Sequence, residues 1–438
     1  MGRLPCMLKP GNRRSLDLDI LILSTYDADG SGIFAKQLLH SVRSLGYSAQ
    51  IVTVTKTSPD PDVKGIYVRR SLGEIAYSIK ARVSRRLYRT KRDYTFLETC
   101  SISANVALSA EIWPNRCRLV ICTFLSGMFS PEGFSNILAR LGDPPVIFYG
   151  VDMNLFTGGC HYPRDCRQYT SDCADCPAIL PAARFLVERN FQKKLGMVRS
   201  LVNHTVVASS DEHRRQIAAS RIFGESDIRE ILMSVSNEVY GANESSRQLL
   251  KVGYGFGNRT LLVRSSSEPR KGGKLFVECI KLLRAESTEM LCSLDIIAVG
   301  DQFIAEQLRP LGINVYSPGY VANESELSKL YSVSDFFINP SLADGGPMML
   351  AQSLMSCTPV ISTDVGLARD LVVSGMTGTI LDEASPSRLA SVIGNYYRKS
   401  DQELAQMRLE ARKAAMTLLS KDVYMGKLSN LIKAKVGY

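Results

Sequence analysis

Hydrophobic and polar positions follow a repeating strand, turn and helix pattern in two long blocks of the chain. The first block opens with an unbroken apolar run, 19–25, which precedes a glycine-containing loop and an amphipathic helix that stops at Gly46. Continuous apolar runs are typical of strands buried on both faces of a parallel sheet. We therefore expect a first β/α domain, with further strands at 47–55, 119–124, 145–149 and 205–209 and helices at 132–141 and 182–200.

The β/α alternation restarts at 260–264, after a polar and irregular stretch, 236–251, that is the best linker candidate. The second block predicts strands at 294–299, 314–316, 336–339 and 360–363 and helices at 274–284 and 324–332. The last segment, 401–435, has a helical pattern throughout and is expected to pack back across the domains. The pattern as a whole predicts an α/β protein with two domains.

The turn after strand 336–339 is the first candidate for ligand chemistry. It contains Asp344 and two glycines, and Pro347 opens the next helix, on which Gln352 lies. Such a turn places backbone N–H groups and a positive helix N-terminus at the carboxyl edge of a parallel sheet, which favours anions.

Two other loops follow strands in the same way. Lys271-Gly272 suits a diphosphate, because it joins a cation to free N–H groups, although a solvated basic loop explains it as well. The loop with Gly30 and Gly32 is either a tight turn or a ligand loop. The glycines at 253–257 precede a strand instead of following one, so they do not indicate a dinucleotide site.

Composition and charge narrow the class of protein. The 438 residues are 45% hydrophobic and 22% charged, as in soluble globular proteins, and no apolar run is long enough to cross a bilayer. We expect no signal peptide, because the N-terminal apolar run is short and broken by acids. The net charge of +10 suits an anionic partner.

One segment concentrates that positive charge. Residues 71–92 predict a basic amphipathic helix, with a stripe formed by Leu72, Ile75, Ile79, Val83 and Leu87. Such a helix lies on an anionic membrane surface or packs its stripe on the domain core. No helix-turn-helix or zinc-finger spacing is present, so we expect no nucleic-acid partner.

Four of the eleven cysteines lie within a short stretch: Cys160, Cys166, Cys173 and Cys176. Thiolates at such spacing can close a tetrahedral zinc site, and we expect structural zinc, with two disulfides or an iron–sulfur cluster as alternatives. Four thiolates leave no open position, so we expect no catalytic metal. His161 is interpreted as a structural or substrate-contacting residue.

The strongest motifs now combine into a resemblance. Lys271-Gly272, Gly300, Gly319 with Val321, and the stretch 340–378 resemble GT-B glycosyltransferases of the retaining family 4, and the motif TGGCHY at 157–162 with the cysteines resembles a branch found in bacterial surface-polysaccharide synthesis. The resemblance implies two Rossmann-like doubly wound domains that face an interdomain cleft. It places an acceptor domain at 1–240 with an insertion at 150–177, a donor domain at 241–410 and a C-terminal helix at 411–438.

The resemblance also implies roles. A nucleotide-diphosphate sugar is the expected donor, with a glycan or polyprenyl-linked acceptor at the cytoplasmic face of the cell membrane. Asp152, Lys271 and Asp344 are the expected catalytic residues; Lys271 neutralises the diphosphate and Gln352 contacts the ribose. The implied donor-binding set is Gly30, Gly32, Arg264, Lys271, Gly300, Val321, Asp344, Gly345, Gly346, Pro347, Met348, Met349 and Gln352.

Several positions depart from the family pattern. Val151 stands where a histidine is usual, and a second histidine is replaced near Phe124. Ser265, with Arg264 beside it, stands at the place of the donor-site arginine, and Gln352 replaces a glutamate. Asp152 is therefore the best sugar or acceptor contact in the first domain. The alternative hypothesis is a catalytically weak or inactive GT-B protein that binds sugar nucleotide or glycan.

Overall fold

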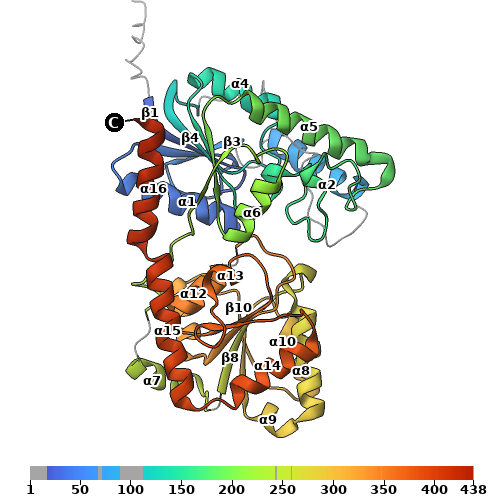
Figure 1. Ribbon diagram of the computed structural model, residues 1–438, viewed down its shortest axis with the longest axis vertical. Helices are drawn as coiled ribbons and strands as arrows, with labels where there is room; N and C mark the ends of the chain where they lie inside the picture. The colour runs from blue at the N-terminus through green and yellow to red at the C-terminus, as the bar shows by residue number, and fades with distance from the viewer. Residues whose placement is uncertain are drawn as a thin grey trace, which may run out of the picture.

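A seven-stranded parallel sheet forms one half of the molecule, in the strand order β3-β2-β1-β4-β5-β6-β7 (Figure 1). The computed structural model describes residues 17–67, 72–88, 112–241, 244–257, 259–346 and 348–437. The strands are β1 (Asp17–Ser24), β2 (Ala49–Thr55), β3 (Val63–Tyr67), β4 (Arg116–Phe124), β5 (Val146–Tyr149), β6 (His204–Ala208) and β7 (Asp227–Glu230). The helices of this half are α1 (Asp29–Ser44), α2 (Leu72–Tyr88), α4 (Pro131–Leu141), α5 (Arg184–Ser200) and α6 (Asp211–Ala219).

The central strand β1 shows why the apolar runs form this sheet. Its residues 20–23 are fully buried, and they alternate between two hydrophobic clusters. Leu21 and Leu23 pack on the side covered by α4 and α5, whereas Ile20 and Ile22 pack on the side covered by α1. A strand buried on both faces needs apolar residues at every position, which is the pattern that the sequence carries.

A six-stranded parallel sheet forms the other half, in the order β10-β9-β8-β11-β12-β13. The strands are β8 (Arg259–Ser265), β9 (Leu294–Gly300), β10 (Val315–Gly319), β11 (Phe336–Asn339), β12 (Val360–Ser362) and β13 (Gly378–Ile380). The helices are α7 (Glu244–Tyr254), α8 (Gly273–Glu286), α9 (Thr288–Cys292), α10 (Phe303–Leu308), α11 (Glu324–Val333), α12 (Met348–Met355), α13 (Ala368–Leu371), α14 (Pro386–Tyr397) and α15 (Asp401–Leu419). Two doubly wound α/β units are thus present, as predicted.

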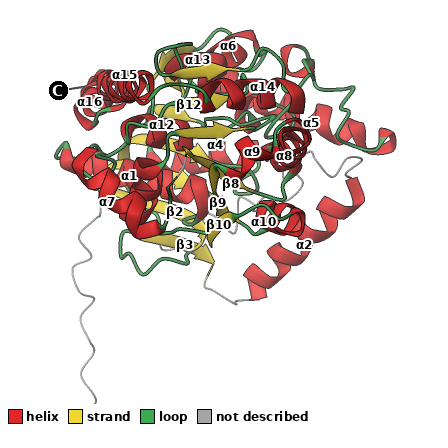
Figure 2. Ribbon diagram, turned by 90° about the horizontal axis from the view of Figure 1, so that it is seen from below, coloured by secondary structure: helices red, strands yellow, loops and turns green. Residues whose placement is uncertain are grey.

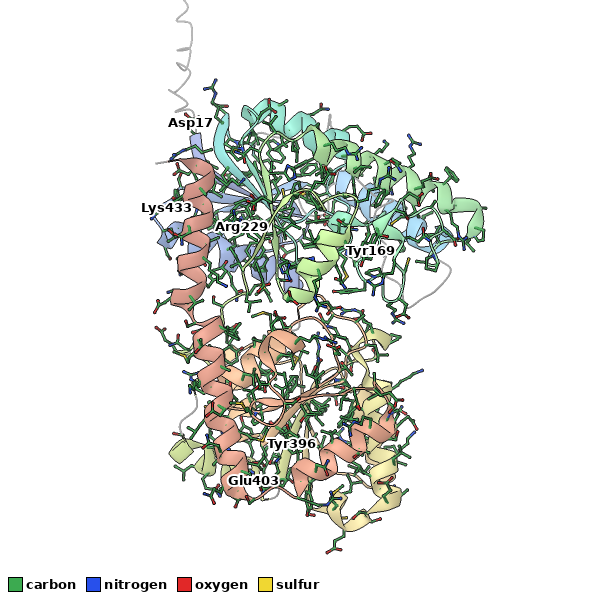
Figure 3. All side chains as sticks on the ribbon, viewed as in Figure 1. Asp17, Tyr169, Arg229, Tyr396, Glu403 and Lys433 are labelled. Atoms are coloured by element: carbon green, nitrogen blue, oxygen red, sulfur yellow. The ribbon has the colours of Figure 1, made fainter. Side chains whose placement is uncertain are left out.

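The C-terminal segment joins the two halves. The predicted single helix is two helices, α15 and α16 (Lys421–Val436), because the backbone is extended at Ser420 (φ −63°, ψ 153°). Tyr424, Leu428 and Ile432 of α16 pack into the core of the first half, while α15 packs on the second (Figure 1). Labelled side chains follow this division, with Lys433 of α16 beside the first sheet and Glu403 of α15 beside the second (Figure 3).

The chain crosses between the halves twice, and the two crossings touch. The first crossing follows β7, and the second lies between α15 and α16; Val235 N–H donates to Leu419 C=O across 3.0 Å. The domain boundaries 1–240, 241–410 and 411–438 stay a prediction, but α16 packs with the first domain.

The linker prediction for 236–251 is wrong in its second part, where α7 begins at Glu244. Asparagine, glycine and serine residues suggested the linker, but other side chains of the same stretch make tertiary contacts. Arg247 and Lys251 form ion pairs with the buried carboxylate of Asp335, so tertiary contacts outweigh a weak local pattern.

Helix α2 matches the predicted basic helix as far as Tyr88; its predicted end, 89–92, and Ser71 lie outside the described residues. Of the two alternatives for its apolar stripe, packing on the core does not hold for the described residues, since Leu72, Ile75, Ile79 and Val83 are 86, 46, 55 and 48% exposed. The helix projects from the body of the molecule (Figure 2). No helix in the described part of the chain combines the length and apolar character that crossing a bilayer requires.

Candidate functional site

The topological switch points of the two sheets lie at the same cavity between the halves of the molecule. In the first sheet the strand order reverses between β1 and β4, and in the second between β8 and β11. Ligands of open parallel sheets bind outside the carboxyl ends of the strands at such points. A cavity of about 450 Å³ lies there, between the halves. Its lining includes these predicted site residues: Gly30, Asp152, Arg264, Lys271, Asp344, Gly346 and Met348.

A buried ion pair dominates the second-domain wall. The Lys271 ammonium contacts the Asp344 carboxylate, and the two side chains are 7 and 10% exposed. Burial opposes the charge on Asp344, but the attraction of Lys271 outweighs it and lowers the pKa of the carboxyl. Burial also lowers the pKa of Lys271, although Asp344 opposes that shift. The site thus holds a desolvated cation whose partner is a single carboxylate oxygen.

The loop after β8 fixes the position of that lysine. Lys271 ends a short 3₁₀ turn, Pro269–Lys271, and Gly272 follows in the left-handed region at φ +72°. A Cβ at Gly272 would lie 1.8 Å from the carbonyl oxygen of Pro340, so only glycine fits. The loop therefore packs directly on the end of β11, which brings Lys271 to Asp344.

Arg270 connects the two walls of the cavity. Its guanidinium lies over the ring of Tyr162, 4.4 Å from the ring centroid, and 3.7 Å from the Asp344 carboxylate. Tyr162 comes from the first domain, so this contact spans the cleft. Three cationic side chains of the second domain, Arg264, Arg270 and Lys271, thus line one cavity.

The start of α12 forms part of the second-domain wall of the cavity. The helix begins at Met348, directly after the turn that contains Gly345 and Gly346, whereas Pro347 lies outside the described residues. A Cβ at Gly345 would lie 2.5 Å from the Val151 carbonyl oxygen of the first domain. Ser209 Oγ also donates to the Gly345 carbonyl oxygen, at 3.3 Å. The helix N-terminus therefore meets the first domain at the cavity.

Among the described residues, these other predicted donor-site positions are not part of the cavity lining: Gly32, Gly300, Val321, Met349 and Gln352. Gln352 Nε2 donates to the Tyr240 hydroxyl at 3.0 Å, and Val321 and Met349 pack against the core of the second domain. Gly300 and Gly32 serve close packing, since a Cβ there would lie 2.1 Å from Ser265 O and 2.3 Å from Asp27 C. Their roles toward a ligand stay predictions.

The first-domain wall contains an aspartate–histidine pair. Asp152 and His161 are 7 and 2% exposed, and His161 Nδ1 lies 2.6 Å from Asp152 Oδ2. Burial opposes the charge on Asp152, but His161 outweighs it, so the pKa of the carboxyl is lowered. The His161 ring stacks on Phe124, with centroids 5.3 Å apart. Sequence reasoning did not predict this pairing, nor the cavity contacts of Tyr162, Ser209 and Arg270.

The four clustered cysteines do not support the zinc prediction. All four thiols are free, and within the described residues no group of three or more histidine, cysteine or acidic side chains is arranged to hold a metal ion. Burial raises the pKa of Cys160, Cys173 and Cys176, so these thiols are protonated in the metal-free protein. Cys173 Sγ instead accepts a hydrogen bond from Gly158 N–H at 3.3 Å.

Comparison with known proteins shows the fold of this molecule and a family match over part of the chain. Residues 258–399, less than half of the chain, match the family model described as glycosyl transferases group 1. Solved structures of the same two-domain shape place the whole chain in the GT-B fold. Together these findings support glycosyltransferase activity. A comparison with curated protein sequences found no match.

Three solved structures illustrate the similarity. Sucrose-phosphate synthase from Thermosynechococcus elongatus has 13% sequence identity and a TM-score of 0.67, over 95% of this chain and 98% of that one. HepE from Anabaena, in complex with UDP and glucose, has 14% identity and a TM-score of 0.64, over 95 and 100%. WaaG, a glycosyltransferase involved in lipopolysaccharide biosynthesis, has 12% identity and a TM-score of 0.63, over 96 and 100%. At these identities the similarity defines the fold.

Proposed function

We propose that this protein is a retaining glycosyltransferase of the family 4 type. It moves a sugar from a nucleotide-diphosphate donor to a glycan or lipid-linked glycan in cell-surface polysaccharide biosynthesis. The observation that carries the proposal is the buried Lys271–Asp344 pair, which faces a cavity at both switch points beside the N-terminus of α12. The UDP-glucose named with HepE and the lipopolysaccharide biosynthesis named with WaaG support it.

The proposed chemistry follows from the charges. The donor diphosphate competes with Asp344 for the Lys271 ammonium, and Arg264 and Arg270 lie in the same cavity. As the bond between the sugar and the diphosphate breaks, negative charge grows on the leaving oxygen, and fixed cations with free N–H groups stabilise it. Asp344, released from Lys271, accepts hydrogen bonds from hydroxyl groups of the sugar. Gln352 remains the proposed contact for the ribose.

A donor panel tests the proposal. Purified protein is incubated with UDP-glucose, UDP-galactose, UDP-N-acetylglucosamine and GDP-mannose, with and without extracted lipid acceptors, and release of the nucleoside diphosphate is measured. We expect release with one donor, and loss of release in Lys271→Ala. Lys274→Ala is the matched control, because Lys274 is exposed on the adjacent helix α8. Release that survives in Lys271→Ala contradicts the assigned role of the lysine.

The same panel separates the enzyme from the alternative, a GT-B protein that binds without catalysis. That alternative is motivated by Val151, which stands where the resemblance leads one to expect a histidine. Binding of a sugar nucleotide by calorimetry, without release in the presence of any acceptor, favours the binding protein.

We also propose that α2 docks on an anionic membrane surface at the cytoplasmic face, where a lipid-linked acceptor is available. Leu72, Ile75 and Ile79 expose an apolar stripe, and the sequence from 69 to 92 is rich in arginine and lysine. Flotation with vesicles of phosphatidylglycerol and phosphatidylcholine measures this. We expect binding that falls with salt and that Ile75→Ser/Ile79→Ser weakens; an unchanged flotation of that variant removes α2 from the interface.

A further inference from the structure

One buried nitrogen in the cavity wall lacks a hydrogen-bond partner. His161 is 2% exposed, and its Nε2 atom has no partner among the described residues, although the ring lines the cavity. A buried polar atom without a partner costs about 1–3 kcal/mol, so such atoms are rare unless a ligand or an ordered water satisfies them. The position of His161 beside the proposed transfer site therefore points to a ligand contact.

The tautomer of the ring is fixed by Asp152. The carboxylate can only accept hydrogen bonds, so His161 Nδ1 must donate across the 2.6 Å contact. The second oxygen of the carboxylate, Oδ1, is also occupied, because Asn154 N–H donates to it at 2.9 Å. In the neutral ring Nε2 then carries a lone pair and no proton. Each oxygen of Asp152 thus already accepts one hydrogen bond, whereas His161 Nε2 presents an acceptor that has none within the described residues.

The ring plane is held from its face as well. Phe124, at the end of β4, stacks on His161 with an interplanar angle of 13°. The next residue, Tyr162, lies under Arg270, which in turn approaches Asp344. These contacts place His161 on the wall opposite the cations proposed to hold the diphosphate, where the sugar of a bound donor would lie.

We infer that His161 Nε2 accepts a hydrogen bond from a hydroxyl of the donor sugar, and that Asp152 is the positioning residue that holds the accepting tautomer. The inference rests on the proposed function and deepens it. It assigns to His161 the sugar contact that the sequence suggested for Asp152. It also gives a reason for the valine at 151, because a histidine already reaches the cavity from a neighbouring loop.

Paired binding measurements test the contact. Calorimetry compares each sugar nucleotide of the panel with its sugar-free partner, UDP or GDP. We expect His161→Phe to keep its affinity for the free diphosphate within about twofold and to lose about tenfold for the sugar nucleotide, as one hydrogen bond predicts. His161→Gln, whose amide oxygen can accept, should recover part of the loss. His40→Gln is the control, because His40 is exposed on α1.

The tautomer gives a second and independent readout. The chain has four histidines, so long-range ¹H–¹⁵N spectra of histidine-labelled protein can be assigned by single substitutions. We expect a proton on Nδ1 of His161, and loss of that fixed state in Asp152→Asn together with the weaker binding of the sugar nucleotide. A proton on Nε2 in the wild-type protein overturns the inference.

The outcomes separate this inference from the proposed function. Wild-type protein that binds no sugar nucleotide refutes the function, and the sugar contact with it. Wild-type protein that binds a donor while His161→Phe binds it equally well refutes only the role of His161. A loss for the free diphosphate as large as that for the sugar nucleotide indicates a structural role and overturns the contact as well.

Discussion

Two adjacent glycines at the start of α12 allow a sharp test of how the domains meet. Gly345 approaches the first domain so closely that an added Cβ would lie 2.5 Å from the Val151 carbonyl oxygen. At Gly346 the nearest atom to an added Cβ is Ser209 Oγ at 3.6 Å, an ordinary contact. Gly345→Ala therefore perturbs the domain contact, whereas Gly346→Ala makes the same chemical change one residue away without a clash.

The expected size of the effect follows from the geometry. Real Cβ contacts essentially never fall below 3.0 Å, whereas the added Cβ would lie 2.5 Å from the Val151 carbonyl oxygen. The two domains must therefore move apart at this contact until the distance exceeds 3.0 Å. Displacements of about 1 Å cost catalysis up to about 100-fold, because the reacting groups lose alignment. We expect Gly345→Ala to lower kcat for donor turnover by about 10- to 100-fold, with a small change in Tm, since the clash lies between domains and not within a core.

The assay is steady-state release of the nucleoside diphosphate, with Tm measured on the same preparations. Gly346→Ala also adds a methyl group at the cavity wall, but without the clash between domains, so its kcat should stay closer to the wild-type value than that of Gly345→Ala. Equal kcat for Gly345→Ala and the wild type would refute the reasoning, because it would mean that the domains need not approach this closely during turnover. A large drop in Tm for Gly345→Ala would place the damage in folding instead of in domain closure.

The remaining predictions concern stability and thiol chemistry. Asp335→Asn leaves two nearly buried cations without their carboxylate and should destabilise the protein by about 3–5 kcal/mol in denaturant titrations. Asp401→Asn removes an ion pair whose carboxylate is 94% exposed and should cost at most about 1 kcal/mol. Equal losses for the two variants would contradict the role of burial. Burial lowers the pKa of His213 from 6.5 to about 4, so the folded state disfavours the charged form of this side chain. The free energy of unfolding should therefore fall by up to about 3 kcal/mol as the pH drops from 6.5 to 4. In His213→Gln, the denaturation midpoint should change less over this pH range. Maleimide labelling, read by mass spectrometry, should modify the exposed Cys292 within minutes and Cys117 only on unfolding. Burial raises the pKa of Cys117 to about 12 and so keeps this thiol unreactive. Early labelling of Cys117 would show that its strand opens readily.

Much of the fold could be predicted from sequence because parallel strands buried on both faces need unbroken apolar runs. The runs at β1, β8 and β11 are of this kind, and the structure confirms them within one or two residues. Helix α6 and strand β7 were not predicted. They lie at a sheet edge, where α6 buries only His213 and Ile217 and β7 has the polar sequence DIRE, so the apolar signal is weak.

Some residues of the candidate site could be predicted from the sequence, and others could not. Lys271 and Asp344 were predictable because each follows the carboxyl end of a strand, and adjacent parallel strands bring such loops together. The pairing of Asp152 with His161 was not. An irregular loop folds back between them, and Met153 N–H donates to the His161 carbonyl oxygen, a contact that no local periodicity records. The spacing of the cysteines did not predict that the thiols are free, because burial and hydrogen bonding of the thiols are not visible in that spacing.

The two touching chain crossings have a mechanical consequence. Because Val235 and Leu419 are hydrogen-bonded to each other, both covalent connections between the domains pass through one narrow place. Two connections held together at one place resist twisting and sliding of the domains but permit rotation about an axis through that place. Relative motion of the domains should therefore be close to a single rotation, which opens or closes the cavity without shearing one wall past the other. Lys271 and His161 would then return to the same mutual position in every cycle.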